Sequence, residues 1–298
     1  MSFEQMLTVQ TPSDAHIAVV NAHNETTIRV ICHILETTTA SFSLYNTQDV
    51  SELIRSFDLT ANMFARISMQ TFESEEDALT QCMKDLDDGR ANILMKGHIP
   101  TSHLLSAVLK HNSKQGQHFL NHVALFDIPD YHKPLMISDV ALNIQPTKSD
   151  MKAMIDNISI FAKQLDYKTL KIALLSSTET IQSKLPSSIQ AQEIKNMFMK
   201  QDTSSLMVDG PFALDNIIDK KSALQKGIQS EVAGDADVII VPHLDVGNAL
   251  YKSLTYFGHA QVASVVIGAR FPIVLTSRAD SMSNKINAIQ LAMKILVK

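Results

Sequence analysis

Short apolar runs rich in β-branched residues alternate with longer amphipathic segments along most of this 298-residue chain. Strands of a parallel sheet are apolar on both faces, whereas a helix that covers the sheet needs only one apolar stripe. The alternation therefore predicts an α/β fold with mainly parallel sheets. In the first half of the chain we expect strands at residues 17–21, 42–45, 93–95, 123–126 and 135–138, and helices at residues 25–37, 49–56, 75–86 and 102–110.

A second series of elements follows the polar segment IQPTKSD at residues 144–150. Ser149 or Asp150 is a suitable cap for the next helix, because a side-chain oxygen can accept hydrogen bonds from the first helical amides. The pattern predicts two α/β domains with a cleft between them, formed by residues 1–147 plus 266–298 and by residues 148–265. In this series we expect helices at residues 151–165, 188–199, 248–257 and 284–297, and strands at residues 171–175, 205–208, 238–241, 262–267 and 273–276.

The composition narrows the choice of partners. Hydrophobic residues make up 45% of the chain and charged residues 19%, which is typical of a globular protein. A net charge of −5 with scattered arginines gives no basic stripe for nucleic acid. The two cysteines form no CxxC pair, and no apolar run is long enough to span a membrane. We therefore expect a cytoplasmic protein without a disulfide framework, a metal site or a membrane segment.

Polar or glycine residues follow several of the predicted strands directly, where open α/β sheets place ligand-binding loops. Lys96 and Gly97 follow one strand, and Thr101 or Ser102 opens the next helix. A helix amino terminus with a nearby lysine suits an anion, although a glycine turn with a helix cap explains the same residues. His132, in a loop between two prolines, is either a general base or simply solvated.

Two further loops lie in the second series. Asp209 and Gly210 end one strand. Asn248, Lys252 and Tyr256 are spaced four residues apart, so they share one face of a predicted helix. This face either contacts a ligand or is the polar side of a capped amphipathic helix.

The segment VLTSRADS at residues 274–281 joins a predicted strand to the last helix. The guanidinium of Arg278 can bind a phosphate through paired donors, and the hydroxyl of Ser277 can donate to a developing negative charge. Asp280 would orient the arginine or accept a proton. Alternatively, Arg278 and Asp280 form only a local salt bridge.

Together these segments resemble the phosphate acetyl/butyryltransferase family, and most closely its phosphate butyryltransferase branch. The resemblance spans about two-thirds of the chain. It is carried by LMKG with Thr101 and Ser102 (94–102), DIPDYHKPL (127–135), VDGPFALDN (208–216), VAGDADVIIVP (232–242), GNALYKSLTYF (247–257) and VLTSRADS (274–281).

The resemblance implies an isocitrate dehydrogenase-like fold of two domains, with the active site in the cleft between them. It also implies reversible transfer of an acyl group between coenzyme A and inorganic phosphate, giving an acyl phosphate, in a homo-oligomer of two or more chains. In related enzymes a Ser-Arg pair lies at the reacting centre, which corresponds to Ser277 and Arg278. A carboxylate further on in those relatives corresponds to the region of Asn284, so Asp280 is the nearer candidate here. The segment HIAVVNAHNETT (16–27) departs from the family, because it lacks the expected glycines.

We expect a short-chain acyltransferase, with butyryl favoured, in which bound phosphate attacks the thioester directly. Cys32 and Cys82 lie outside every motif, which argues against a covalent cysteine intermediate. No permanently bound cofactor is expected, since coenzyme A and phosphate are the substrates. The predicted catalytic residues are Ser277, Arg278 and Asp280, and the predicted substrate-binding residues are Lys96, Gly97, Thr101, Asp139, Asp209, Gly210, Asn248 and Lys252.

Two other functions are compatible with the sequence. One is a non-catalytic protein of the same fold that senses acyl-CoA or acyl phosphate, which would bind ligand without turnover. The other is a hydroxy-acid dehydrogenase that uses NAD and a divalent metal, for which Asp209, Asp215 and Asp245 are the available carboxylates.

Overall fold

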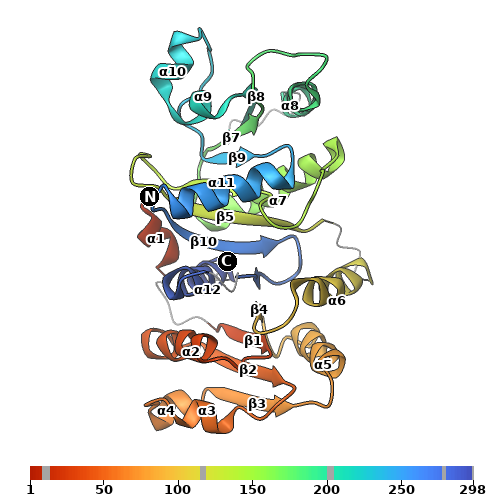
Figure 1. The fold of residues 1–298 in the computed structure, drawn as a ribbon, viewed down its shortest axis with the longest axis vertical. Coiled ribbons are helices and arrows are strands. Elements are labelled where there is room, and N and C mark those ends of the chain that lie inside the picture. The colour runs from red at the N-terminus through yellow and green to blue at the C-terminus, as the bar shows by residue number, and fades with distance from the viewer. Residues whose placement is uncertain (9–13, 115–118, 200–204, 277–279, 297–298) are drawn as a thin grey trace. The chain divides into compact units, whose positions relative to one another are not determined.

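The computed structural model of the chain describes residues 1–8, 14–114, 119–199, 205–276 and 280–296. The chain forms two compact units. Unit 1 consists of residues 1–6 and 119–262, and unit 2 of residues 7–118 and 263–298. Both are α/β units (Figure 1). The short helix α1 (Phe3–Leu7) begins in unit 1, and its last residue, Leu7, belongs to unit 2.

Unit 2 is built on mostly parallel strands. These are β1 (His16–Val20), β2 (Ser41–Asn46), β3 (Ile67–Thr71), β4 (Ile93–Lys96), β10 (Gln261–Ile267), which begins in unit 1, and β11 (Ile273–Val274). Their order is β3-β2-β1-β4-β11-β10, and every neighbouring pair is parallel except β11 with β10. The segment after residue 262 thus returns to extend the sheet begun by the first part of the chain.

The helices of unit 2 lie on both sides of these strands (Figure 1). They are α2 (Glu25–Thr37), α3 (Ser51–Arg55), α4 (Ala61–Phe64), α5 (Glu75–Asp87), α6 (Thr101–Lys114) and α12 (Met282–Leu296). α12 packs against α2, and α5 packs against α6. The amino termini of α2 and α12 both follow strands of the sheet, so they lie at its carboxyl edge.

Unit 1 has its own series of strands and helices. Its strands are β5 (Asn121–Asp127), β6 (Leu135–Ser138), β7 (Leu170–Leu175), β8 (Leu206–Phe212) and β9 (Val238–Ile240). Their order is β5-β6-β9-β7-β8, with β5 antiparallel to β6 and the other neighbours parallel. Its helices are α7 (Lys148–Gln164), α8 (Pro186–Phe198), α9 (Leu214–Ile218), α10 (Lys220–Gln225) and α11 (Leu244–Tyr256).

The predicted α/β class with largely parallel sheets is confirmed. The element that sequence reasoning missed most clearly is β3, which lies at one end of the strand order and buries only its first residue, Ile67. An edge strand with exposed side chains lacks the apolar run that marks the central strands. The predicted cap at Ser149 or Asp150 was wrong. Thr147 caps α7, in a capping box with Asp150.

The predicted domains and the two compact units differ at residues 1–6, 119–147 and 263–265, and the middle segment is the longest. The prediction groups residues 119–147 with the first part of the chain, whereas these residues belong to unit 1. They carry β5 and β6, and β6 pairs in parallel with β9. Such a pairing between distant segments leaves no local trace in the sequence, and the division into domains itself stays a prediction.

A buried carboxylate joins β2 to α5 within unit 2. The hydroxyl of Tyr45 donates to Oδ2 of Asp85 at 2.6 Å, while Gln81 and Arg90 donate to Oδ1, each at 2.6 Å. Burial alone would raise the pKa of Asp85, but the hydrogen bonds from Tyr45, Arg90 and Gln81 outweigh it and hold the pKa below its ordinary 3.8. The ionised form is therefore the one that stabilises the fold.

We expect Asp85→Asn to lower the free energy of unfolding by about 1 to 3 kcal/mol near neutral pH, because the charge-assisted hydrogen bonds are lost. A carboxylate with a lowered folded-state pKa contributes stability above its unfolded pKa, and this contribution disappears as the pH falls through the folded value. The difference in free energy of unfolding between wild type and Asp85→Asn should therefore become smaller below pH 3.8. Urea unfolding across this range measures it.

Asp88→Asn is the matched control, since Asp88 also pairs with Arg90 but is exposed. It should change the free energy of unfolding by less than about 1 kcal/mol. If the difference in free energy of unfolding between wild type and Asp85→Asn were the same at neutral and acidic pH, the ionised carboxylate would not have the role given to it here.

Candidate anion-binding site

The predicted site residues divide between the two units. Unit 2 carries Lys96, Gly97, Thr101, Ser277, Arg278 and Asp280, and unit 1 carries Asp139, Asp209, Gly210, Asn248 and Lys252. Ser277 and Arg278 lie outside the described residues.

A pocket of about 250 Å³ opens at the carboxyl edge of the unit 2 strands. Lys96 ends β4, Thr276 follows β11, and Asn24 precedes α2. The described residues that line it are Asn24, Thr26, Thr27, Met95, Lys96, Gly97, His98, Thr276 and Lys285. The structure thus brings two predicted residues, Lys96 and Gly97, together with the residue that precedes Ser277 in the sequence.

Gly97 is required by the close approach of the chain after β1. Its amide donates to the carbonyl of Val20 at 3.0 Å, and the amide of His98 donates to that of Asn21 at 2.7 Å. A Cβ at position 97 would lie 2.4 Å from each of these carbonyl oxygens. Only glycine therefore lets the ends of β1 and β4 meet in this way. Next to it, Lys96 is 8% exposed, and its Nζ lies 3.4 Å from the Gly97 carbonyl.

The amino terminus of α2 contributes to the same pocket. Asn24 is its N-cap, and the Asn24 side chain accepts from the amide of Thr27 at 2.9 Å. The aligned peptide dipoles and free amides of a helix amino terminus favour an anion. The described lining includes two buried lysines, Lys96 and Lys285, and no Asp or Glu. This pocket is consequently suited to a negatively charged ligand.

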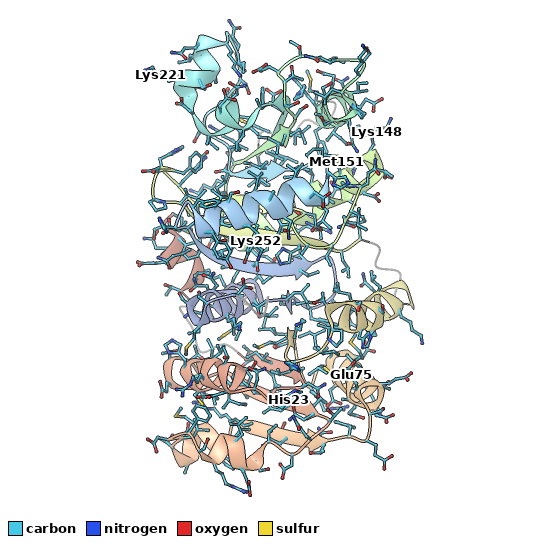
Figure 2. The ribbon with its side chains drawn as sticks, in the orientation of Figure 1. His23, Glu75, Lys148, Met151, Lys221 and Lys252 are labelled. Atoms are coloured by element: carbon cyan, nitrogen blue, oxygen red, sulfur yellow. The ribbon has the colours of Figure 1, made fainter. Side chains whose placement is uncertain are left out.

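One residue of the pocket lining, His98, lies next to a second histidine, His23. The rings of His23 and His98 are 4.8 Å apart between centroids, and His23, labelled in Figure 2, precedes α2. Burial and the nearby His98 lower the pKa of His23 below its ordinary 6.5. His23 therefore favours its neutral form at neutral pH, which leaves the two lysines as the main source of positive charge.

Thr101 and Asp280 lie elsewhere in unit 2. Thr101 is exposed at the first position of α6, and Asp280 is half-buried two residues before α12. Neither lines the pocket. Lys285 lines the pocket, although the sequence analysis did not select it. The feature that could have identified it is a charged residue at a position of α12 where the helical pattern places buried residues.

In unit 1, both carboxylate oxygens of Asp139 accept hydrogen bonds from neighbouring residues. One carboxylate oxygen accepts from the amides of Ala141 and Leu142, both at 2.8 Å. The other accepts from the amide of His122 at 3.0 Å and from Asn143 at 2.6 Å. These bonds fix the chain that follows β6.

Asp209 lines a separate pocket of about 350 Å³ in unit 1, together with Lys195 and Ser230. Lys195 pairs with it at 2.6 Å, and the Ser230 hydroxyl donates to it at 2.6 Å. The described residues of this pocket include neither Asn248 nor Lys252.

The other predicted residues of unit 1 are placed by close backbone or side-chain contacts. Gly210 packs so closely on β7 that a Cβ would lie 2.7 Å from the Leu174 carbonyl. The side-chain Nδ2 of Asn248 donates to the Val140 carbonyl at 3.4 Å. Lys252, labelled on α11 in Figure 2, lies over the ring of Tyr251. His132, the candidate base, pairs with Asp235 at 2.8 Å.

Among the described residues, no helix is both long and apolar enough to cross a membrane. Their His, Cys, Asp and Glu side chains form no group of three that could hold a metal ion.

The sequence profile of the phosphate acetyl/butaryl transferase family matches residues 15–293. The chain belongs to this family. A probable phosphate butyryltransferase of Bacillus subtilis is 37% identical to it over 278 residues, which cover 93% of this chain and 91% of the relative. The phosphate butyryltransferase of Clostridium beijerinckii is 30% identical over the same shares of the two chains.

A solved member of similar fold is a branched-chain phosphotransacylase from Enterococcus faecalis. It superimposes with a TM-score of 0.82 and 30% sequence identity, covering 95% of this chain and 99% of that one. The family resemblance carried by the sequence motifs is thus confirmed.

We expect Gly97→Ala to lower the free energy of unfolding by at least about 2 kcal/mol, because the new methyl group would displace backbone carbonyls. Gly89→Ala is the control. Gly89 has a φ of +72° but no atom within 4 Å of the position of a Cβ, so its cost is conformational strain of about 1 kcal/mol. Urea unfolding of both variants tests the close approach, and equal losses would contradict it.

Proposed function

We propose that this protein catalyses the reversible transfer of a short acyl group between coenzyme A and inorganic phosphate, with an acyl phosphate as product. The observation that carries the proposal is the pocket with two buried lysines, in a member of the phosphate acetyl/butaryl transferase family. A site of this charge suits the inorganic phosphate that the reaction requires.

In the proposed mechanism, phosphate and acyl-CoA bind together and a phosphate oxygen attacks the thioester carbonyl. A C–O bond forms, the C–S bond breaks, and the proton released by phosphate is taken up by the departing coenzyme A thiolate. Holding both reactants in attack geometry removes much of the entropic barrier to their encounter. Lys96 and the amino terminus of α2 hold the phosphate.

Ser277 and Arg278 follow the pocket residue Thr276 directly in the sequence. We assign Arg278 to the phosphate, since a guanidinium binds phosphate oxygens in pairs. Ser277 donates to the oxygen of the thioester carbonyl as negative charge develops on it. Asp280 orients the arginine, or it accepts the proton of the attacking phosphate and passes it on to the departing thiolate.

Direct transfer is favoured over a covalent cysteine intermediate by the state of the two thiols. Burial raises the pKa of both Cys32 and Cys82. A raised pKa keeps the nucleophilic thiolate scarce. Neither residue lines the pocket.

The remaining predicted residues keep a role in substrate binding. Asn248 and Lys252 offer donors to the anionic groups of coenzyme A. Asp139, Asp209 and Gly210 act by shaping the loops that carry them, because their polar groups are engaged with neighbouring residues. Thr101 is the first residue of α6, and the free amides of this helix terminus can donate to an anionic group of the substrate.

We also infer a cytoplasmic homo-oligomer. Phe257, at the end of α11, is 84% exposed, and Leu224 on α10 is 64% exposed. Large apolar side chains of this kind are candidates for cover by a second copy. Light scattering of the purified protein measures the number of chains.

Butyryl is the acyl group that we favour, because two relatives that match over 93% of the chain are named butyryltransferases. Relatives named acetyltransferases match over smaller shares, such as 67% and 73% of the chain. We expect a higher kcat/KM with butyryl-CoA than with acetyl-CoA, with isobutyryl-CoA measured alongside. Thiol release in the presence of phosphate reports the rate. A preference for acetyl-CoA would contradict this assignment, and tight ligand binding without any turnover would favour a sensing protein.

We expect Arg278→Ala to lower kcat/KM by roughly a hundredfold or more, because a contact to the reacting phosphate is lost in the transition state. Arg270→Ala is the control, since Arg270 is exposed and lies 3.8 Å from Asp87. Its activity should stay close to wild type. Near-normal turnover by Arg278→Ala would sink the assigned role.

A further inference from the structure

Lys285 occupies a position of α12 that an apolar residue would normally fill. It is 9% exposed, and the buried residues Ala288, Ile289 and Ala292 follow it at helical spacing. Residues three, four and seven positions apart share one face of a helix. The lysine therefore extends the buried stripe of the helix toward its amino terminus.

The ammonium of Lys285 has no countercharge in the described part of the chain. None of the hydrogen bonds or ion pairs found among the described residues involves its Nζ. Other partly buried lysines are paired: Lys133 with Asp237 at 2.7 Å, and Lys195 with Asp209 at 2.6 Å. Lys285 thus differs from these lysines in having no acidic partner among the described residues, and its ammonium is open to an anion in the pocket that it lines.

Lys285 lines the same pocket as Lys96, Thr276 and the amino terminus of α2. Three sources of positive potential thus face one space, and the described lining of that space contains no Asp or Glu. The pocket volume of about 250 Å³ is several times the roughly 30 Å³ that one water molecule takes up in the liquid. This volume is large enough for a small oxyanion, which would bring a negative charge close to Lys285.

We propose that Lys285 is a second lysine of the phosphate site, which binds the phosphoryl oxygens of inorganic phosphate and of the acyl phosphate. The identity of the anion rests on the function proposed above. The phosphoryl group stays anionic throughout the reaction, so Lys285 binds ground state and transition state alike. Its removal then raises the KM for phosphate and leaves kcat nearly unchanged.

The first test is binding without turnover. The melting temperature of wild type is measured with and without inorganic phosphate, in the absence of any acyl-CoA, and compared with that of Lys285→Met. A ligand that binds only the folded state raises the melting temperature. We expect the phosphate-induced rise to be lost in Lys285→Met. The ligand-free variant should melt close to the wild-type temperature, because the substitution removes no ion pair of the described residues.

The second test separates phosphate from coenzyme A in steady-state kinetics. Loss of a charge-assisted hydrogen bond should raise the KM for phosphate about tenfold or more, with the KM for butyryl-CoA unchanged. Lys285→Arg should retain part of the phosphate affinity. Lys294→Met, at the other end of α12, is the matched control, since its ammonium donates to the Thr8 carbonyl at 3.2 Å. Lys285→Gln gives the same readout if the methionine variant does not fold.

Two results would overturn the proposal. A variant that is less stable without ligand and keeps the wild-type affinity for phosphate would show a structural lysine. A rise in the KM for butyryl-CoA alone would assign the ammonium to a phosphate of coenzyme A. If the proposed function were wrong, wild type would bind phosphate without transferring acyl groups. The melting experiment would still decide the role of Lys285, because it requires no turnover.

Discussion

The candidate site depends on one backbone contact, in which the carbonyls of Val20 and Asn21 accept the amides of Gly97 and His98. This contact holds the ends of β1 and β4 together where both chains leave the sheet. The chain after β1 leads into α2, and the residue before Gly97 is Lys96. A helix amino terminus and a buried lysine are therefore brought to the same pocket by hydrogen bonds that involve no side chain.

The electrostatic arrangement of the pocket follows a second constraint. Two buried lysines lie in the described lining of this pocket, and that lining contains no Asp or Glu. Its positive potential is therefore directed at a ligand rather than at a carboxylate of the lining. Asp85, by contrast, has its hydrogen bonds within the fold, and its carboxylate serves stability.

The sequence predicted most central strands because burial on both faces leaves a continuous apolar run, as in β1, where residues 17–20 are fully buried. It predicted the family because motifs depend on residue type and order. The sequence alone does not single out Lys285, because a lysine in an amphipathic helix is usually on the exposed face, and its burial is visible only in the fold. The engagement of Asp139 with four donors was also invisible, because three of these donors are backbone amides.

The place of β11 in the sheet bears on how the protein folds during synthesis. β11 pairs with β4, yet it is made after all of unit 1. A ribosome therefore releases β1 to β4 long before their last neighbour exists, and β4 meanwhile presents an open, apolar edge. Such edges attract other chains. Unit 2 is therefore complete only once residues 263–298 have been made, which leaves this edge of β4 uncovered for most of synthesis.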